Sequence, residues 1–329
     1  MEATIKWGII GLGKIAHSFA SDLALIPEAE LTGVASSDLE RAKVFANQFN
    51  AKTYYDSYEM LLQDSSIQII YIATLHPDHQ KWSIKAMEAG KAVLCEKPLA
   101  MNRQQVTEMV AASRKHKVFL MEAFWTRFNP AYIQAKQWIA EGKIGKLRYI
   151  NATFSFYGLE KDKDSRILNL EKGGGALLDI GLYPVFLAYS LLGIPDKIQS
   201  SAIQMDSGLD LQISMIFNYS EAQAVLYSGI TNDEDMTARI CGTAGSLYLG
   251  SRWHEAASIK YVYEETEEKL PFQLLGKGYS YEILEAHQCL RKDMYESELW
   301  SHQNSLEMVT LLDTIREQCG IYYPADKVN

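Results

Sequence analysis

The sequence of 329 residues contains few cysteines, and none of them is paired in the spacing of a metal knuckle. The four thiols, Cys95, Cys241, Cys289 and Cys319, are scattered along the chain with no Cys-x-x-Cys pair. This spacing argues against a disulfide framework and against a zinc site, so we expect no metal. Isolated thiols are typical of a reducing compartment, and we expect a cytoplasmic protein.

Positive charge and long apolar runs are also scarce. Lysine and arginine number 32 against 41 acidic residues, which gives a net charge of −9. A nucleic-acid-binding protein normally carries a basic face, so we expect no nucleic-acid partner. No apolar run approaches the roughly 20 residues of a membrane helix, and the N-terminus lacks the layout of a signal peptide. We therefore expect no membrane partner.

The first third of the chain alternates apolar segments with amphipathic segments. Such strands, apolar throughout and separated by helices, are typical of a doubly wound parallel sheet buried on both faces. We predict strands at 6–10, 30–35, 69–73, 92–95 and 118–121 and helices at 15–25, 39–49, 78–89 and 102–116. The fold class is α/β, and residues 1–122 form the first of about two domains.

The pattern changes after residue 122. Helices are predicted at 130–141, 176–192, 281–291 and 303–319, and strands at 147–156, 198–204, 211–219, 222–229, 237–241, 246–249 and 258–263. Closely spaced strands favour a large, mainly antiparallel open sheet, so residues 123–329 are predicted to form an α+β domain. The polar run 264–269 is predicted to be a solvated loop. An open sheet face usually meets a partner, and we expect a homodimer through it.

A glycine-rich turn follows the first predicted strand and begins the first helix. It is Gly11-Leu-Gly13-Lys14-Ile15-Ala16. Gly11 permits the sharp turn, Gly13 lets a pyrophosphate approach the backbone, and Ala16 lets the helix pack on the strand. The helix that begins at Lys14 and Ile15 presents its N–H groups to the anion. The turn predicts dinucleotide binding, although a simple helix cap or a methyltransferase turn has a similar sequence.

The end of the second strand indicates which cofactor is bound. An acidic residue there would bind a ribose hydroxyl and favour NAD. Ser36 and Ser37 can instead donate to a 2′-phosphate, and Arg41 lies one helical turn further on. Asp38 is also present, and it can equally cap the helix that begins at residue 39. We expect NADP as the cofactor, with NAD as the alternative.

Two further motifs carry chemistry. Glu96-Lys97-Pro98 ends a predicted parallel strand, where ligands bind in open α/β sheets. Asp179 and Tyr183 are four residues apart in a predicted helix and would share one helical face.

With the glycine turn, these motifs resemble the glucose-fructose oxidoreductase and inositol dehydrogenase (Gfo/Idh/MocA) family over the whole chain. Many members carry histidine at the position of Tyr183. Tyrosine there is similar to the branch that contains glucose-fructose oxidoreductase and dimeric dihydrodiol dehydrogenase.

The resemblance implies an NAD(P)-dependent dehydrogenase that acts on CH–OH groups of a cyclic polyol, sugar or trans-dihydrodiol. Hydride would pass between the carbinol carbon and the nicotinamide while Tyr183 takes the hydroxyl proton. The Lys97 ammonium would favour the phenolate and hydrogen-bond the substrate oxygen. Asp179 would orient Lys97 or a second substrate hydroxyl.

The resemblance also implies a wider set of contacts. Beyond the glycine turn and the serines, the expected cofactor contacts are Thr74, His76, His79, Glu96, Lys97, Trp125 and Arg127. The expected substrate contacts are Lys97, Phe156, Arg166, Asp179 and Tyr183.

Two other functions stay open at this point. A nicotinamide-binding sensor could use the same fold without turnover, because function lies in the site and not in the fold. Lys97 and Tyr183 argue against a sensor, which needs no proton relay. A reductase of an imine or a tetrapyrrole is the second alternative, and it would not need a relay suited to a hydroxyl.

Overall fold

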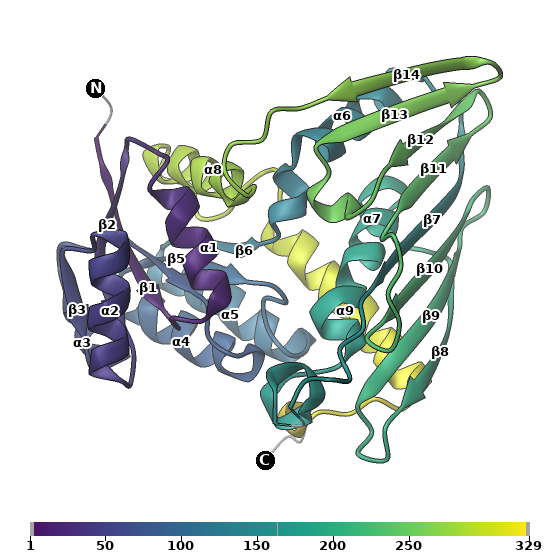
Figure 1. Cartoon of the computed structure of the whole chain (residues 1–329). Coiled ribbons are helices and arrows are strands. Elements are labelled where there is room, and N and C mark those ends of the chain that lie inside the picture. Colours follow the sequence, from purple (N-terminus) through teal and green to yellow (C-terminus); the bar gives the residue numbers. More distant parts are fainter. Residues whose placement is uncertain (1–2, 163, 327–329) are drawn as a thin grey trace. The chain divides into compact units, whose positions relative to one another are not determined.

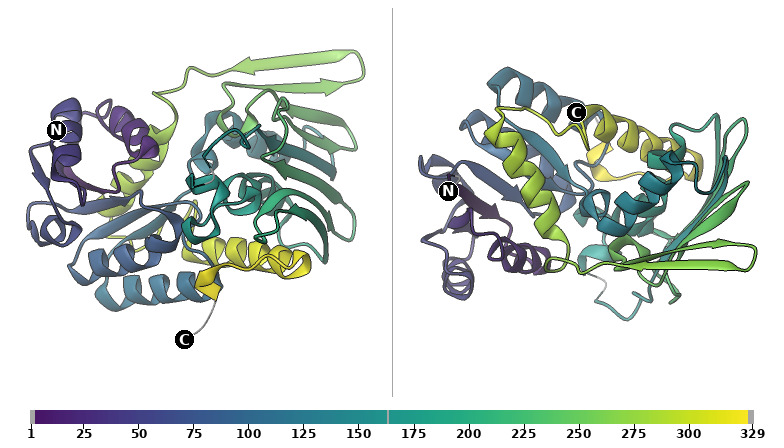
Figure 2. Two further views of the ribbon diagram at one scale, coloured as in Figure 1. Left: turned by 60° about the horizontal axis from the view of Figure 1, so that its bottom comes forward. Right: turned by 90° about the horizontal axis from the view of Figure 1, so that it is seen from above.

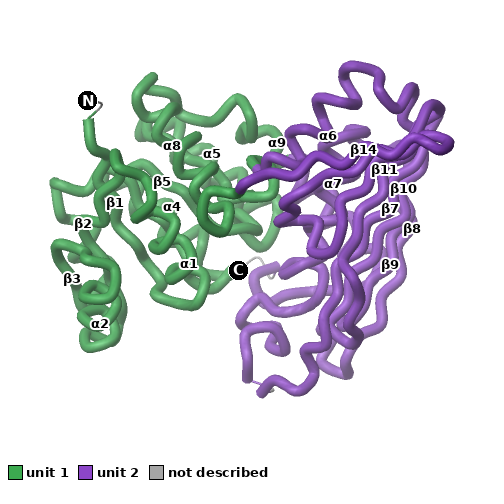
Figure 3. Tube along the Cα trace, turned by 45° about the horizontal axis from the view of Figure 1, so that its top comes forward, with its two compact units in different colours: residues 1–128, 274–306 green, residues 129–273, 307–329 purple. Residues whose placement is uncertain are grey.

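The computed structural model describes residues 3–162 and 164–326. The chain forms two compact units, drawn in different colours in Figure 3. Unit 1 comprises Met1–Phe128 and Leu274–Leu306, and unit 2 comprises Asn129–Gln273 and Glu307–Asn329. A single boundary after residue 122 does not describe this division, because the segment from Leu274 to Leu306 belongs to unit 1.

Unit 1 contains a six-stranded parallel sheet in the order β3-β2-β1-β4-β5-β6. Its strands are β1 (Ile5–Ile10), β2 (Ala29–Ala35), β3 (Thr53–Tyr55), β4 (Ile69–Ile72), β5 (Ala92–Glu96) and β6 (Leu120–Ala123). Strands β4, β5 and β6 are buried at every position, as apolar strands covered on both faces must be. The strand order reverses between β1 and β4, and ligands of open α/β sheets bind at such a point.

Helices cover the unit 1 sheet on both faces (Figures 1 and 2). They are α1 (Lys14–Leu23), α2 (Leu39–Phe49), α3 (Tyr58–Gln63), α4 (His79–Glu88), α5 (Arg103–His116) and α8 (Tyr279–Arg291), with 3-10 turns η1 (His76–Asp78) and η2 (Trp125–Phe128). The short elements β3 and α3 were not predicted.

Helix α8 lies beside α1, although some 250 residues separate them in the chain (Figure 1). The buried Asp22 of α1 accepts hydrogen bonds from the backbone N–H groups of Lys277 and Tyr279 at 2.9 Å. A carboxylate that caps the first turn of a helix in this way stabilises it. This contact is one physical reason why the segment 274–306 belongs to unit 1.

Unit 2 contains an eight-stranded sheet in the order β14-β13-β12-β11-β7-β10-β9-β8. All neighbours pair antiparallel except β7 and β10, which pair parallel. The strands are β7 (Leu147–Ser155), β8 (Lys197–Gln204), β9 (Asp210–Asn218), β10 (Gln223–Gly229), β11 (Ala238–Gly242), β12 (Gly245–Leu249), β13 (Ser258–Tyr263) and β14 (Thr266–Pro271). The prediction of a large, mainly antiparallel sheet is confirmed.

Helices lie along one face of the unit 2 sheet and leave the other face without helices (Figure 2). They are α6 (Pro130–Ala140), α7 (Leu182–Leu192) and the second half of α9 (His302–Cys319). Short turns complete the unit: η3 (Arg166–Leu168), η4 (Leu170–Lys172), the π-helical η5 (Leu177–Gly181), η6 (Trp253–Glu255) and η7 (Pro324–Asp326).

Two expectations need correction. The polar run 264–269 is largely strand, because β14 pairs antiparallel with β13. It lies at the sheet edge, where exposed charges discourage further pairing. Within the described residues, the stretch Leu170–Leu192 has the length and composition of a membrane span, contrary to the expectation that no run approaches it. Its most apolar window is 83% buried inside the structure, as the core helix of a globular unit is.

Candidate active site

The glycine-rich turn of unit 1 has the geometry that an anion requires. Gly11 has a φ of +89°, and a Cβ there would lie 2.5 Å from the backbone of Ala73. A Cβ at Gly13 would meet no atom within 4 Å, so the backbone at this position faces open space. No side chain caps helix α1, which begins at Lys14, and Ala16 is fully buried. The first N–H groups of α1 can therefore face a pyrophosphate.

At the end of β2, the structure brings Ser36 and Arg41 together. The buried Ser36 Oγ accepts a hydrogen bond from Arg41 Nε at 2.9 Å and another from the Asp38 backbone N–H at 3.1 Å. Asp38 Oδ1 accepts the Arg41 backbone N–H at 3.1 Å, so Asp38 caps helix α2. Ser37 is exposed. Two hydroxyls and a guanidinium are donors that suit a phosphate.

Lys97 follows β5 at the carboxyl edge of the parallel sheet. Its backbone N–H donates to Glu96 Oε2 at 3.2 Å. Glu96 is 6% exposed, and its Oε1 accepts a hydrogen bond from the Tyr71 hydroxyl. The Lys97 side chain is half-buried. These bonds fix the backbone from which the Lys97 side chain starts.

His79 joins the turn after β4 to the turn after β5. Its Nδ1 lies 2.8 Å from the Pro98 carbonyl oxygen and its Nε2 lies 3.3 Å from the Thr74 carbonyl oxygen. The ring of His76 lies 5.6 Å away, and both histidines are buried. The His79 ring therefore lies between Thr74 and the Lys97–Pro98 turn, with the shorter contact at the Pro98 carbonyl.

Trp125 and Arg127 lie on η2 and are nearly buried. The Trp125 ring stacks on Tyr279 of α8, with centroids 4.9 Å apart and an interplanar angle of 6°. Arg127 Nε donates to the Leu299 carbonyl at 2.8 Å. Tyr279 was not predicted, because α8 lies far along the chain and a lone tyrosine gives no sequence signal.

In unit 2, Asp179 lies in a π-helical turn and Tyr183 lies in α7 directly after it. The helix predicted over 176–192 is confirmed, but its first turn, Leu177–Gly181, is π-helical and not α-helical. A four-residue spacing across a π turn does not place Asp179 and Tyr183 as in an α-helix. The buried Asp210 Oδ2 accepts the Leu177 backbone N–H at 2.6 Å, and burial raises the pKa of Asp210 to about 7.

Two aromatic rings lie beside Tyr183, which is 4% exposed. The Phe154 ring from β7 lies 5.2 Å away and the His254 ring from η6 lies 5.3 Å away. Phe154 and His254 stack on each other at 4.3 Å with an angle of 21°. His254 was not predicted as a site residue, because it follows Trp253 in an irregular segment that no motif marks.

Asp179 forms an ion pair with Arg166, with 2.8 Å between Oδ1 and the guanidinium. Asp179 is 7% exposed, whereas the Arg166 side chain is 39% exposed. Phe156 is half-buried and lies under the Lys161 ammonium, 4.8 Å from the ring centre. Within unit 2, the structure therefore brings Arg166 to Asp179 and brings Phe154 to Tyr183.

Among residues 3–162 and 164–326, no group of three or more His, Cys, Asp or Glu side chains is placed to hold a metal ion. The four cysteines are free thiols.

Comparison with known proteins gives the same family for both units. The family model described as "Oxidoreductase family, NAD-binding Rossmann fold" matches residues 5–124, and the "GFO/IDH/MocA C-terminal domain" model matches residues 132–248. Trans-1,2-dihydrobenzene-1,2-diol dehydrogenase of Xenopus tropicalis is 38% identical over 97% of this chain and 99% of its own length. The human enzyme of that name is 35% identical over 98% and 99%.

Solved structures have the same fold. A 3-ketoreductase from Actinomadura kijaniata, solved with NADP and TDP-benzene, matches with a TM-score of 0.86 and 25% identity over 96% of this chain and 98% of its own. An aldose-aldose oxidoreductase from Caulobacter crescentus matches with a TM-score of 0.88 at 21% identity over 96% and 98%. The chain belongs to the Gfo/Idh/MocA oxidoreductase family, and it is an NAD(P)-dependent oxidoreductase that acts on hydroxyl groups.

Proposed function

We propose that this enzyme oxidises one hydroxyl-bearing carbon of a cyclic vicinal diol, of which a trans-dihydrodiol is the best example, and that it uses NADP. Sugars and cyclic polyols are the other substrates of this class. The observation that carries the proposal is the surroundings of Tyr183, where two aromatic rings and a buried carboxylate lie in the same unit. Relatives named for a trans-dihydrodiol, at 38% and 35% identity, support it.

Each proposed catalytic side chain has a distinct task. The nicotinamide cofactor, when bound, supplies the carbon that exchanges hydride. The Tyr183 phenolate oxygen takes the proton of the substrate hydroxyl and becomes the neutral phenol, as a general base does. The Lys97 ammonium favours the tyrosinate and donates a hydrogen bond to the substrate oxygen as negative charge develops there.

Phe154, His254 and Asp179 have side chains of the kinds that bind a flat or puckered ring with two hydroxyls. The stacked Phe154 and His254 rings offer aromatic surface to the apolar side of such a substrate. The Asp179 carboxylate can accept a hydrogen bond from the second hydroxyl, and the Arg166 guanidinium holds that carboxylate in place. The chemistry of this group of residues therefore favours a vicinal diol over a simple alcohol.

Preference for NADP follows from the end of β2. Asp38 has a local role as helix cap, so it does not mark the site for a ribose hydroxyl. The Arg41 guanidinium is held at Ser36 Oγ, and a 2′-phosphate would gain charge-assisted hydrogen bonds there.

The first test is formation of reduced nicotinamide by the purified protein. NADP and NAD are offered separately with trans-1,2-dihydrobenzene-1,2-diol, with a panel of aldoses and with inositols. We expect turnover of the dihydrodiol with NADP at the highest kcat/KM. Turnover of aldoses or inositols alone contradicts the diol assignment, and faster turnover with NAD contradicts the cofactor assignment. Tight NADP binding with no turnover of any substrate favours the sensor alternative.

We also propose a cytoplasmic homodimer formed through the helix-free face of the unit 2 sheet. Ile203 of β8 and Ile216 of β9 are 59% and 37% exposed, which is unusual for isoleucines in a sheet. Light scattering on the wild type and on an Ile216→Lys variant tests the assembly. A dimer in the wild type and a monomer in the variant are the expected results.

A further inference from the structure

We infer that Glu122 is a positioning residue that holds the Lys97 loop in its working conformation through the Leu99 backbone. This inference rests on the proposed role of Lys97. The loop comprises Glu96, Lys97, Pro98 and Leu99, and Glu122 lies on the neighbouring strand β6.

The first step is the register of the sheet. Strand β6 pairs parallel with β5 so that Glu122 lies opposite Cys95. Glu122 Oε1 accepts the Leu99 backbone N–H at 2.9 Å, and Cys95 Sγ lies 3.8 Å from the Leu99 carbonyl oxygen. Leu99 is two residues after Lys97. The side chain of one strand therefore fixes the loop that leaves the next.

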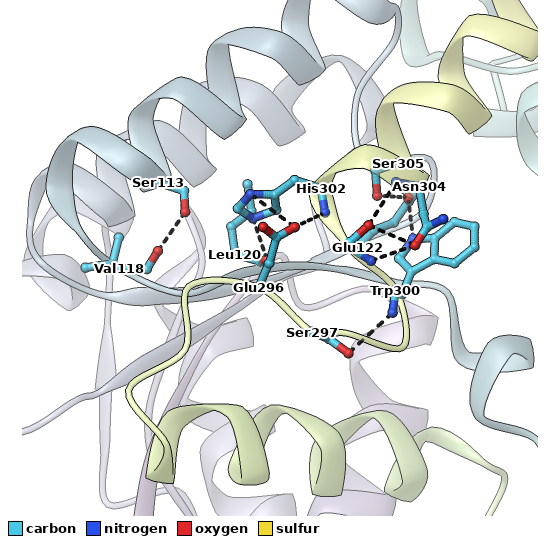
Figure 4. Close-up of polar contacts among 11 residues, drawn as sticks. Ser113, Val118, Leu120, Glu122, Glu296, Ser297, Trp300, His302, Asn304 and Ser305 are labelled. Carbon is cyan, nitrogen blue, oxygen red and sulfur yellow. Dashed lines mark hydrogen bonds and ion pairs between the residues drawn. The ribbon is translucent and has the colours of Figure 1, made fainter.

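The second oxygen of the Glu122 carboxylate binds a different part of unit 1 (Figure 4). Glu122 Oε2 accepts a hydrogen bond from Trp300 Nε1 at 3.0 Å and one from the Ser305 hydroxyl at 2.7 Å. Both donors belong to the segment of unit 1 that comes from the last part of the chain. Glu122 thus joins this segment to the loop that carries Lys97.

The same segment is fastened to β6 independently of Glu122. The Leu120 backbone N–H donates to the Tyr295 carbonyl at 3.0 Å, and the His302 ring lies 3.0 Å from the Leu120 carbonyl through Nε2 (Figure 4). These bonds cover the edge of the sheet. A change confined to Glu122 therefore leaves other contacts to hold the segment in place.

The donors decide which side chain fits at position 122. A backbone N–H and an indole N–H can only donate, so each oxygen of Glu122 faces an obligatory donor. Burial raises the pKa of Glu122, while hydrogen bonds from Ser305, Trp300 and Leu99 and the charge of Lys97 act in the opposite direction. A carboxylate satisfies both sides of the site, whereas a carboxamide must turn its NH2 group toward Leu99 or Trp300.

The test begins with Glu122→Gln in the full-length protein. We expect kcat for the diol to fall about tenfold to a hundredfold, because a shift of about 1 Å in a catalytic group costs on that order. The Kd for NADP, from quenching of tryptophan fluorescence, should change less than about threefold. The matched control is Glu296→Gln, the same change at a carboxylate of the segment 274–306 that accepts the His302 backbone N–H instead of the Leu99 and Trp300 N–H groups.

A second variant separates positioning from simple loss of structure. Trp300→Phe removes one obligatory donor and keeps an aromatic ring at that position. In the double variant Glu122→Gln with Trp300→Phe, the amide oxygen can accept from Leu99 while its NH2 donates to Ser305, whose hydroxyl can also accept. We expect kcat of the double variant to recover at least fivefold over Glu122→Gln alone.

Three results overturn the inference: an unchanged kcat in Glu122→Gln, an equal loss in Glu296→Gln, or a double variant that shows no recovery. Lys97→Met, assayed in parallel, distinguishes the inference from the proposed function. If Lys97→Met keeps most of the wild-type kcat, the proposed function of Lys97 fails. If Lys97→Met is inactive while Glu122→Gln is normal, the inference about Glu122 alone fails.

Discussion

Unit 1 and unit 2 hold their proposed catalytic side chains by different means. In unit 1, Lys97 leaves the end of a buried strand, and its loop is bonded to Glu122 and His79. In unit 2, Tyr183 lies on a helix that begins with a π turn, and Asp210 accepts the N–H of that turn. The loop is held from strand β6 and from the first residue of helix α4, whereas the helix start is held from strand β9.

The pKa values of three buried carboxyl groups differ according to the hydrogen-bond donors around each. Burial raises the pKa of Glu122, and the three hydrogen bonds that Glu122 accepts act against this rise. Burial raises the pKa of Asp210 to about 7. The pKa of Glu282 in α8 is raised well above its ordinary value, and its two oxygens have no hydrogen-bond partner among the described residues. Donors offset the cost of burying a charge, so the three groups differ although all are buried.

The largest expected effect is the loss of kcat when the proposed general base of unit 2, Tyr183, is removed. Tyr183→Phe should lower kcat about a hundredfold to ten-thousandfold, because it removes the proton acceptor and leaves the ring in its cluster. The Kd for NADP should stay close to that of the wild type. Tyr189→Phe is the matched control, since Tyr189 lies on the same helix and its hydroxyl donates to Glu307. A Tyr183→Phe variant with wild-type kcat would disprove the mechanism.

The next effect concerns the pH dependence of stability that the buried Asp210 contributes. The pKa of Asp210 is about 7 in the folded protein and 3.8 in an unperturbed carboxyl. A raised pKa contributes stability below pH 3.8 that is lost as the pH rises to about 7, amounting to about 4 kcal/mol at most. The free energy of unfolding should therefore fall with rising pH between pH 3.8 and about 7. Asp210→Asn should remove the part of this slope that Asp210 contributes.

Urea unfolding at several pH values measures that slope. The exposed Asp206 supplies the control, and Asp206→Asn should keep the wild-type slope. Equal slopes in Asp210→Asn and the wild type would show that Asp210 does not titrate in this range.

A smaller effect concerns unit 1 alone. Arg41→Ala should raise the KM for NADP about tenfold to a hundredfold, because a hydrogen bond to a charged group contributes about 1.5–3 kcal/mol. The KM for NAD should change little. Lys43→Ala, on the same helix and paired with Glu40, tests whether any lost positive charge has this effect. An equal rise for both cofactors in Arg41→Ala would count against recognition of the 2′-phosphate.

The smallest effect concerns the aromatic rings of unit 2. His254→Ala should raise the KM for the diol about threefold to tenfold, because an aromatic contact contributes about 0.5–1.5 kcal/mol. His254→Phe should restore most of the affinity, since it replaces one stacking ring with another. Steady-state kinetics with the diol measure both, and an unchanged KM in His254→Ala would remove His254 from the substrate site.

Much of unit 1 could be predicted because its signals are local. The apolar runs of β1, β4 and β5 and the glycines after β1 lie within short windows of sequence. The carboxyl end of β5, and with it Lys97, follows from them. The strands β3 and β14 were missed because one is only three residues long and the other is highly charged.

The sequence by itself determined the two kinds of sheet, the dinucleotide turn and the motif residues Lys97, Asp179 and Tyr183, because periodicity and motifs need only neighbouring residues. Only the tertiary structure decided which side chains surround them. Glu122 meets Trp300 across 178 positions, Asp22 meets Lys277 across 255, and Asp210 meets Leu177 across 33. Such contacts depend on how buried elements pack, and a carboxylate removed from water is held wherever packing supplies its donors.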